Sequence, residues 1–519
     1  MIVHGRQFER TPRKRTRLAL RVLVISVQLA AWGTVQAGSW QLVPRFSSEE
    51  TYTDNVRQTE NDRDGDFITS VSPGVSVRGE SARLETNIDY NWRQQFYADE
   101  TSFDRNNHQL QADIAATGVE NWLYFDLNSR ISQQSSDVRR FQSLNNRGRN
   151  NQLSDVTSLD LAPRIEHSFG SLGEMRLGYA HQIVNRSRAG GDPGADFGPG
   201  FNIANGSSVE DGVNLDLQSG SITGRMPVQL QAKARDLKFE SGRDRKFRSV
   251  QTNVSYIVDR QFKLKGTSGY DSNTYDSRQG QASGLFWTAG GSWTPSARTS
   301  LDFDWGHRYF GRTIDVKARH TRRRWLFDFS YGTSLRTANQ FERDLILVPL
   351  TDADGLPVFD PVTSGQILVP VDSPNATDDV FIETRASGGL TYTMRRGSLN
   401  LRYFEAKRES DTVTDTNRTR GVSFNLRRNL RPRLHADMAA MWRNNKQGAL
   451  GPTSASGATT GNYYSIYPSV SYELGPHTTA RFQYELTINN GASGFGLTGT
   501  SASPNFYENA FTASLAFHL

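Results

Sequence analysis

Beyond residue 80, apolar and polar side chains alternate along runs of about ten residues. In the first run, Leu84, Thr86, Ile88, Tyr90 and Trp92 alternate with charged or amide residues from Arg83 to Arg93. The same alternation recurs at 123–131, 159–165, 175–179, 228–232, 250–256, 285–293, 301–305, 325–331, 434–442, 466–474 and 480–486. A period of two indicates strands with one apolar and one polar face.

The connections between these runs alternate in length. Tight turns at 79–81, 118–121, 170–173, 294–298, 395–398 and 475–477 interleave with much longer polar loops. We therefore predict an all-β fold, a single transmembrane up-and-down antiparallel β-barrel of about 22 strands (range about 20–24), with short periplasmic turns and long extracellular loops. A soluble solenoid or propeller would show a fixed repeat length or two buried strand faces, and neither is seen.

The first 37 residues have the pattern of a targeting segment. Seven Lys and Arg residues from Arg6 to Arg21 precede the apolar run Val22 to Trp32, and Val35 and Ala37 occupy the positions that a signal peptidase recognises. We predict a cleavable Sec signal peptide at 1–37 and the barrel at 38–519. The alternative is a retained anchor, which the short apolar run disfavours because a spanning helix needs about 20 residues.

The net charge changes once that segment is set aside. The whole chain has 60 basic residues (Lys and Arg) and 54 acidic residues (Asp and Glu). Residues 1–37 hold seven of the basic residues and one of the acidic residues, so 53 basic and 53 acidic residues remain. The basic character of the whole chain therefore gives no reason to expect nucleic-acid binding. The sequence has no cysteine, which excludes disulfides, thiolate metal sites and a lipid-modified N-terminal cysteine.

The C-terminal residues also fit a barrel of the Gram-negative outer membrane. Alternate positions up to the end of the chain are apolar, namely Phe511, Leu515, Phe517 and Leu519. We predict that they form a closing strand that the barrel assembly machinery recognises, although such strands usually end in Phe. Tryptophans near strand ends predict aromatic girdles in contact with outer-membrane lipid, among them Trp40, Trp122, Trp293 and Trp325.

Four short motifs carry a resemblance to a known family. They are Glu50 to Val56 (ETYTDNV), Trp293 to Thr299 (WTPSART), Gly306 to Gly311 (GHRYFG) and the residues around Arg322, Arg323 and Trp325. The chain resembles a family of outer-membrane β-barrels associated with PEP-CTERM and exosortase exopolysaccharide systems. The resemblance implies a barrel in a Gram-negative exopolysaccharide setting, with no established activity.

No group of residues predicts catalysis, so we expect no enzyme. His167 and His307 fall on lipid-facing positions without the nucleophile and orienting carboxylate that a catalytic triad requires. His435 and Asp437 share the polar face of one strand, but two ligands are too few for zinc. We interpret them as a hydrogen-bonded pair in a polar lumen.

No resident cofactor is expected either. Asp62, Asp64 and Asp66 resemble a calcium loop because spaced carboxylates flank a glycine, and so does the segment from Asp352 to Gly355. Neither has the closing Glu of the full loop. We interpret both as solvated turns, with calcium at the first as the alternative.

The long extracellular loop at 335–379 contains two near-copies of one apolar run. They are Ile346, Leu347, Val348 and Pro349, and Ile367, Leu368, Val369 and Pro370. In solvent they would form an exposed apolar patch. We predict that they pair as a hairpin that folds into the barrel mouth and constricts or covers the lumen.

A barrel of about 22 strands encloses a lumen that side chains do not fill. Positions predicted to line it carry both signs of charge, namely Arg83, Glu85, Asp89, Arg93, Asp126, Arg130, Asp160, Arg164 and Glu166. Clear strands begin soon after the predicted signal, so we expect no preceding plug domain, which argues against a TonB-dependent receptor. We predict a pore or conduit that selects by size and charge.

The family resemblance implies that this conduit serves exopolysaccharide export or assembly, with exopolysaccharide and its export proteins as partners. The alternative is a surface interaction or structural barrel with a blocked lumen, whose long loops bind a partner or polysaccharide.

Overall fold

The computed structural model describes residues 38–135, 153–188, 207–240, 244–278, 280–337, 347–349, 368–370, 380–412, 416–447, 459–491 and 505–518. Within this part of the chain, 22 strands form one sheet and two short strands form another. The predicted signal peptide lies outside the described residues. No helix in the described ranges has the length and apolar character needed to cross a bilayer.

The strands of the large sheet are β1 (Ser39–Thr53), β2 (Asp66–Glu80), β3 (Leu84–Tyr97), β4 (Arg105–Val119), β5 (Leu123–Ser135), β6 (Leu153–Ser168), β7 (Gly173–Arg188), β8 (Ser208–Ser219), β9 (Val228–Phe239), β10 (Arg245–Ile257), β11 (Phe262–Ser277), β12 (Gly280–Ser296), β13 (Thr299–Arg308), β14 (Gly311–Arg322), β15 (Trp325–Thr337), β18 (Val380–Met394), β19 (Gly397–Ser410), β20 (Thr416–Arg431), β21 (Leu434–Gln447), β22 (Thr459–Gly475), β23 (Thr478–Gly491) and β24 (Phe506–His518). The small sheet pairs β16 (Leu347–Pro349) with β17 (Leu368–Pro370). Two 3-10 turns cover Thr101–Phe103 and Ser221–Thr223.

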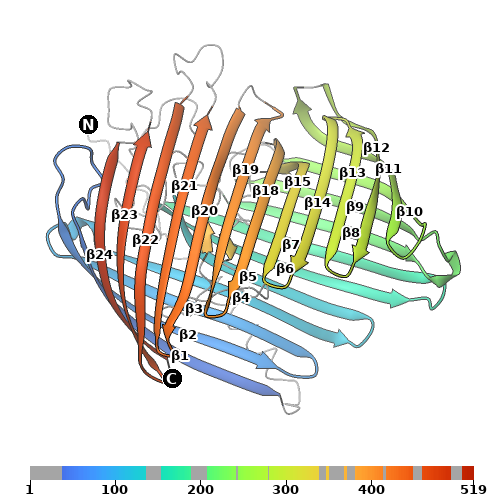
Figure 1. The fold of residues 1–519 in the computed structure, drawn as a ribbon. Coiled ribbons are helices and arrows are strands. Elements are labelled where there is room, and N and C mark those ends of the chain that lie inside the picture. Colours follow the sequence, from blue (N-terminus) through green and yellow to red (C-terminus); the bar gives the residue numbers. More distant parts are fainter. Residues whose placement is uncertain are drawn as a thin grey trace, which may run out of the picture.

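The large sheet closes on itself. Each strand pairs antiparallel with its neighbour along the chain, and β1 also pairs antiparallel with β24 from Arg45 opposite His518 to Thr53 opposite Ala510. In Figure 1, β1 in blue and β24 in red meet at this seam. The fold is therefore a single closed up-and-down barrel, and the predicted strand number of about 22 is confirmed.

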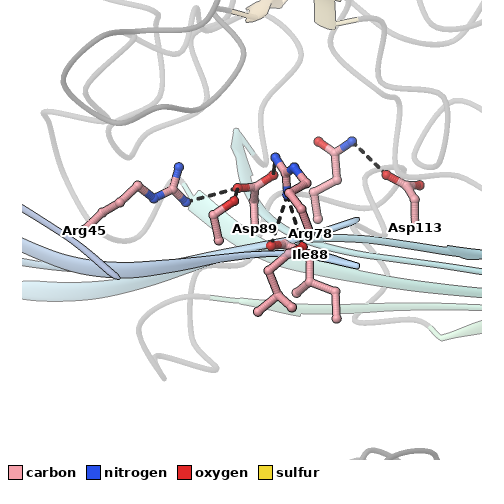
Figure 2. Close-up of polar contacts among 8 residues, drawn as sticks. Arg45, Arg78, Ile88, Asp89 and Asp113 are labelled. Atoms are coloured by element: carbon pink, nitrogen blue, oxygen red, sulfur yellow. Dashed lines mark hydrogen bonds and ion pairs between the residues drawn. The ribbon is translucent and has the colours of Figure 1, made fainter. Parts of the chain in front are cut away.

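The two faces of the sheet differ as the alternation predicts. Large apolar side chains at every second position are exposed on the outer face, for example Trp92 (36%), Phe511 (57%) and Leu285 (79%). Such a surface suits a hydrocarbon environment, in which a closed barrel satisfies every backbone hydrogen bond. Figure 2 shows Asp89 and Arg78 on one side of the sheet and Ile88 on the other.

The two ends of the barrel also differ. At one end every connection is short, from 81–83 between β2 and β3 to 476–477 between β22 and β23. Trp40, Trp122, Trp293 and Trp325 lie at this end with 45–53% of their surface exposed. These positions fit an aromatic girdle at the periplasmic interface.

At the opposite end, the expectation of long loops holds only in part. The β15–β18 connection spans 338–379, but β13 and β14 close through residues 309–310 alone. Gly311 follows with a φ of +117°, a backbone conformation that glycine adopts without strain. At the same end, β11 ends at Ser277 and β12 begins at Gly280, so this connection is also only two residues long. The strict alternation of short and long connections is therefore wrong at both hairpins.

Three prolines lie in the middle of strands, and each interrupts the hydrogen-bond ladder to one of the two neighbouring strands. The β2–β3 register passes from Val71 opposite Gln94 to Gly74 opposite Asn91, which places Pro73 opposite Trp92. The same reading of the β6–β7 and β22–β23 registers places Pro163 opposite Tyr179 and Pro468 opposite Tyr484. Proline has no N–H to donate, and each proline here faces an outward aromatic ring across the interrupted ladder.

Candidate functional site

Asp89, on β3, joins three strands on the inner face of the barrel. Its carboxylate accepts hydrogen bonds from Arg45 of β1 at 3.2 Å, Arg78 of β2 at 2.7 Å and Ser76 at 2.8 Å. Figure 2 shows this group above the sheet, with Asp113 of β4 further along the same face. The carboxylate and its two guanidinium partners neutralise one another in part, and they cross-link the start of the barrel.

Arg164, on β6, is the centre of a second inner-face group. Its guanidinium pairs with Asp126 of β5, lies 3.0 Å from Oε1 of Glu166, and stacks 4.9 Å from the centre of the Tyr124 ring. The wall here again carries both signs of charge in contact. A lining of this kind selects solutes by the electric field of its many charges and not by one binding residue.

The remaining sequence-predicted lumen residues have different environments. Arg93 pairs with Glu49 of β1, and Asp160 accepts a hydrogen bond from Gln182 at 3.0 Å. Arg130 lies half-buried on the inner face of β5, and Glu85 is exposed near the short-turn end of β3. Arg83 is a correction: it lies in the turn at 81–83 and not on a strand, because β3 begins at Leu84.

A more deeply buried ion-pair group on β15, β18 and β19 was not identified from the sequence. Nε of Arg408 donates to Oε2 of Glu383 at 2.9 Å, and both side chains are 3% exposed. Arg336 of β15 approaches the other carboxylate oxygen at 3.7 Å. The sequence held little signal, since Arg336 fell inside the predicted loop at 335–379 and no alternating run was predicted around Glu383 or Arg408, and the depth of burial follows from the shape of the mouth.

Two distant parts of the mouth are joined by hydrogen bonds. The Tyr275 hydroxyl of β11 donates to Oδ2 of Asp411 at 2.7 Å, and the backbone N–H of Arg278 donates to the Asp411 carbonyl at 2.7 Å. Tyr309 donates to the Tyr275 oxygen at 2.8 Å, and burial raises the pKa of the Tyr309 phenol, which keeps its proton. We call Tyr275, Tyr309 and Asp411 the mouth latch.

The mouth latch requires the rim to bend inward. Asp411 follows β19, and β11 and β19 are six strand spacings apart, about 29 Å along a flat sheet. Yet the two hairpin ends are in hydrogen-bond contact. The early end of the β13–β14 hairpin leaves room for this contact above it.

Packing shows which part of the rim bends. Val380 and Leu335 continue the outer faces of β18 and β15, but they pack against Phe247, Tyr275 and Ala282 on the inner faces of β10, β11 and β12. An outer face meets an inner face only where the β15–β18–β19 end turns into the mouth. The loop at 338–379 therefore begins and ends at buried positions, with Thr337 and Val380 at most 1% exposed.

The two apolar copies inside that loop pair with each other. Leu347 lies opposite Pro370, Val348 opposite Val369 and Pro349 opposite Leu368, in an antiparallel arrangement. Figure 1 draws this short pair within the outline of the barrel. Ile346, Ile367 and the other residues of the loop lie outside the described part, and the constriction of the lumen stays a prediction.

The other candidate sites show ordinary structural contacts. Asp64 pairs with the exposed Arg57 at 3.2 Å, whereas Asp66 accepts the backbone N–H groups of Asp99 and Glu100 at 3.0 Å each. Asp62 adopts a positive φ of 54° in the same loop. In the ranges that the structure describes, no cluster of three or more His, Cys, Asp or Glu is arranged to hold a metal ion.

The three histidines considered in the sequence analysis, His167, His307 and His435, all lie on strands of the barrel wall. His167 and His307 are exposed on outer-face positions, and His167 contacts the ring of Phe169 edge-on at 4.7 Å. His435 bonds to Asn429 at 2.9 Å and Glu473 at 3.1 Å, while Asp437 accepts from Arg427 at 2.9 Å. His435 and Asp437 thus bond to other residues and not to each other, so the predicted His435–Asp437 pair is wrong.

The C-terminal strand has the expected orientation. Phe511 and Phe517 are exposed on the outer face at 57% and 39%, Leu515 shares that face, and β24 joins β23 to β1. Leu519 lies outside the described residues. The apolar alternation of this strand therefore forms part of the lipid-facing surface at the seam.

Comparisons with known proteins bear on the fold alone. No protein-family model matches the sequence, and no curated protein matches it. Among solved structures, the FrpB iron transporter from Neisseria meningitidis (F5-1 variant, apoprotein form) aligns with a TM-score of 0.51 at 11% identity, over 95% of this chain and 82% of that chain. The F3-3 variant of the same transporter gives 0.51 at 10% identity, over 93% and 82%. The siderophore receptor PirA from Acinetobacter baumannii gives 0.47 at 10%, over 92% and 80%.

The closed antiparallel barrel, its apolar outer face and its polar inner face define the class of protein. The chain is an outer-membrane β-barrel of the Gram-negative type. Its similarity to solved structures extends to the barrel architecture and gives no substrate.

Proposed function

We propose that the protein is a conduit across the outer membrane and that its cargo is an exopolysaccharide. The observation that carries the conduit is the closed 22-strand barrel with a polar inner wall of mixed charge. The exopolysaccharide and the partnership with export proteins rest on the motif resemblance. Insertion by the barrel assembly machinery belongs to the same proposal, and no catalytic step is assigned to the barrel.

The inward-bent rim makes this a restricted conduit. The mouth latch and the buried Glu383–Arg408 pair hold the β15–β18–β19 end within the opening. Passage is then limited by the mouth and by the loop that starts and ends there. A polymer chain threaded end-on fits such an opening better than a folded protein does.

The same observation supports a second candidate function. If the mouth is fully closed, the barrel is a structural or interaction protein whose loops at 54–65, 338–379 and 492–505 bind a surface partner or polysaccharide. The two candidates differ in one measurable property, the flow of ions and solutes through the lumen.

Conductance across planar bilayers separates them. The purified barrel should give discrete conductance steps, and liposomes that contain it should release small labelled dextrans faster than large ones. Barrels that are folded, as shown by heat-modifiable migration on a gel, but give neither steps nor release would leave the interaction function as the only candidate.

A further inference from the structure

Arginines are concentrated in one arc of the short-turn end. The five successive turns at 258–261, 297–298, 323–324, 395–396 and 432–433 contain Arg260, Arg298, Arg323, Arg324, Arg395, Arg396 and Arg433, all exposed. Their only carboxylate is Asp259, which accepts the backbone N–H groups of Gln261 and Phe262 within its own turn. We call these seven residues the basic rim.

The other short turns do not share this charge. Those at 81–83, 120–122, 169–172, 220–227 and 476–477 hold Arg83 and Arg225 against Glu120. The balanced charge of residues 38–519 therefore conceals a strong local asymmetry. Like charges held this close repel one another, so the arrangement favours binding of an anion that lies across several turns.

A hollow within the basic rim gives the arc a defined binding site. It has a volume of about 470 Å³ and is lined by Arg260, Arg298 and Arg319 together with hydroxyls that include those of Ser300 and Thr321. In the described ranges no carboxylate lies within ion-pair distance of these three arginines. Guanidinium groups without carboxylate partners, beside hydroxyl groups, suit an acidic sugar ring with its own hydroxyls.

The hollow belongs to the lumen side of the wall. Ser300 and Arg319 lie opposite each other in the β13–β14 ladder, on the face opposite to the exposed Phe303 and Trp305. Membrane lipid contacts the outer face, so a lipid headgroup is not the natural occupant. Successive short turns are two strand spacings apart, about 10 Å, so the arc offers evenly spaced cations to a chain with repeated charges.

We propose that the basic rim docks an acidic polysaccharide, one whose sugars carry carboxylate or phosphate groups, at the periplasmic opening of the barrel. This inference rests on the proposed function and names the charge class of its cargo. The guanidinium groups hold the anionic groups of the polymer, and the hollow at Arg260, Arg298 and Arg319 takes one sugar unit at the point where the chain enters the lumen.

The test is a binding measurement on the full barrel in nanodiscs of uncharged lipid. The probe is an oligogalacturonate, with a maltodextrin of equal length as the neutral control. The proposal expects salt-sensitive binding of the oligogalacturonate only, and a loss of about tenfold or more in affinity in the triple variant Arg260→Gln, Arg298→Gln, Arg319→Gln. The matched control, Arg83→Gln with Arg225→Gln on the other turns, should bind as the unchanged barrel does. Heat-modifiable migration verifies that each variant is folded.

Several results would overturn the proposal. They are equal loss of affinity in the triple variant and the control, equal affinity for polyglutamate and oligogalacturonate, or binding that requires phosphatidylglycerol in the nanodisc. The second and third would assign the basic rim to an acidic protein or to lipid. Conductance is measured separately: conductance without oligogalacturonate binding refutes this inference alone, and binding without conductance refutes the conduit alone.

Discussion

The Thr53 hydroxyl, at the end of the first strand, donates a 2.7 Å hydrogen bond to the Glu508 carboxylate on the last strand. Just beyond it, the Asp54 carboxylate accepts the backbone and side-chain N–H groups of Asn509, both at 2.7 Å. Asn55 donates to the Tyr507 carbonyl at 3.0 Å. The motif from Glu50 to Val56, which carries part of the family resemblance, therefore continues the seam after β1–β24 pairing ends.

The seam contacts predict a stability change. Asp54→Ala removes the acceptor for two Asn509 donors, so we expect the free energy of unfolding to fall by about 1–3 kcal/mol. The measurement is the urea midpoint of the folded barrel in detergent. Asp64→Ala in the same loop is the control, because its partner Arg57 is 41% exposed and such a pair contributes little. Equal shifts in the two variants would show that the seam contacts carry no special weight.

The buried pair predicts a larger loss. Glu383→Gln leaves the Arg408 guanidinium in a site where both side chains are 3% exposed, so the barrel should lose about 3–5 kcal/mol. Replacing both residues together, as Glu383→Leu with Arg408→Leu, should recover part of that loss. Urea unfolding midpoints measure the stability of both variants. A double variant less stable than Glu383→Gln would contradict the claim that the unpaired buried charge causes the loss.

The mouth latch predicts a change in permeability. Tyr275→Phe combined with Asp411→Ala removes the hydrogen bonds of the Asp411 carboxylate to Tyr275 and Ser277, which join the β11 and β19 ends, so conductance should rise and larger dextrans should pass. Tyr270→Phe is the control, because Tyr270 lies on the outer face of the same strand and is 49% exposed. Unchanged conductance in a folded double variant would show that other contacts hold the rim.

Deletion of residues 345–371 tests the predicted constriction. If the loop narrows the lumen, conductance should rise or larger solutes should pass, while the barrel retains heat-modifiable folding. A deletion variant that conducts as before but no longer attaches surface polysaccharide would support the interaction function instead.

The signal peptide is tested by sequencing the N-terminus of the protein from outer-membrane fractions. We expect it to begin at Gly38, because Val35 and Ala37 fit a cleavage site. Recovery of the intact chain in the inner membrane would indicate a retained anchor.

Strand number and face were predictable from the sequence because each depends on a period of two within a short run. Phe511, Ile88 and Asp89 each lie on the expected face for this reason. Arg83 was misplaced by one residue at a strand boundary, where alternation carries least information. The short β11–β12 and β13–β14 turns were missed because nothing in their composition distinguishes them from longer loops.

The mouth latch and the basic rim could not be predicted from alternation, because both depend on the three-dimensional closure of the barrel. Tyr275 and Asp411 are 136 residues apart, and their contact depends on how far the rim bends. Arg260 and Arg396 share a surface only once each turn is assigned to an end of the closed barrel. The net charge of the chain gave no sign of the basic rim, because it sums the charges at both ends of the barrel.

The short β13–β14 hairpin also sets how deeply the barrel sits in the bilayer. β13 has 10 residues, close to the minimum of about 9–11 that a tilted strand needs to cross the hydrocarbon layer. The membrane slab must therefore lie between Thr299 and Arg308 at this point of the wall. β11, with 16 residues, then rises above the slab by roughly 15 Å after allowing for strand tilt. The end of β11 and the bent rim therefore stand outside the cell, above the hydrocarbon layer, with Tyr275 buried inside the rim.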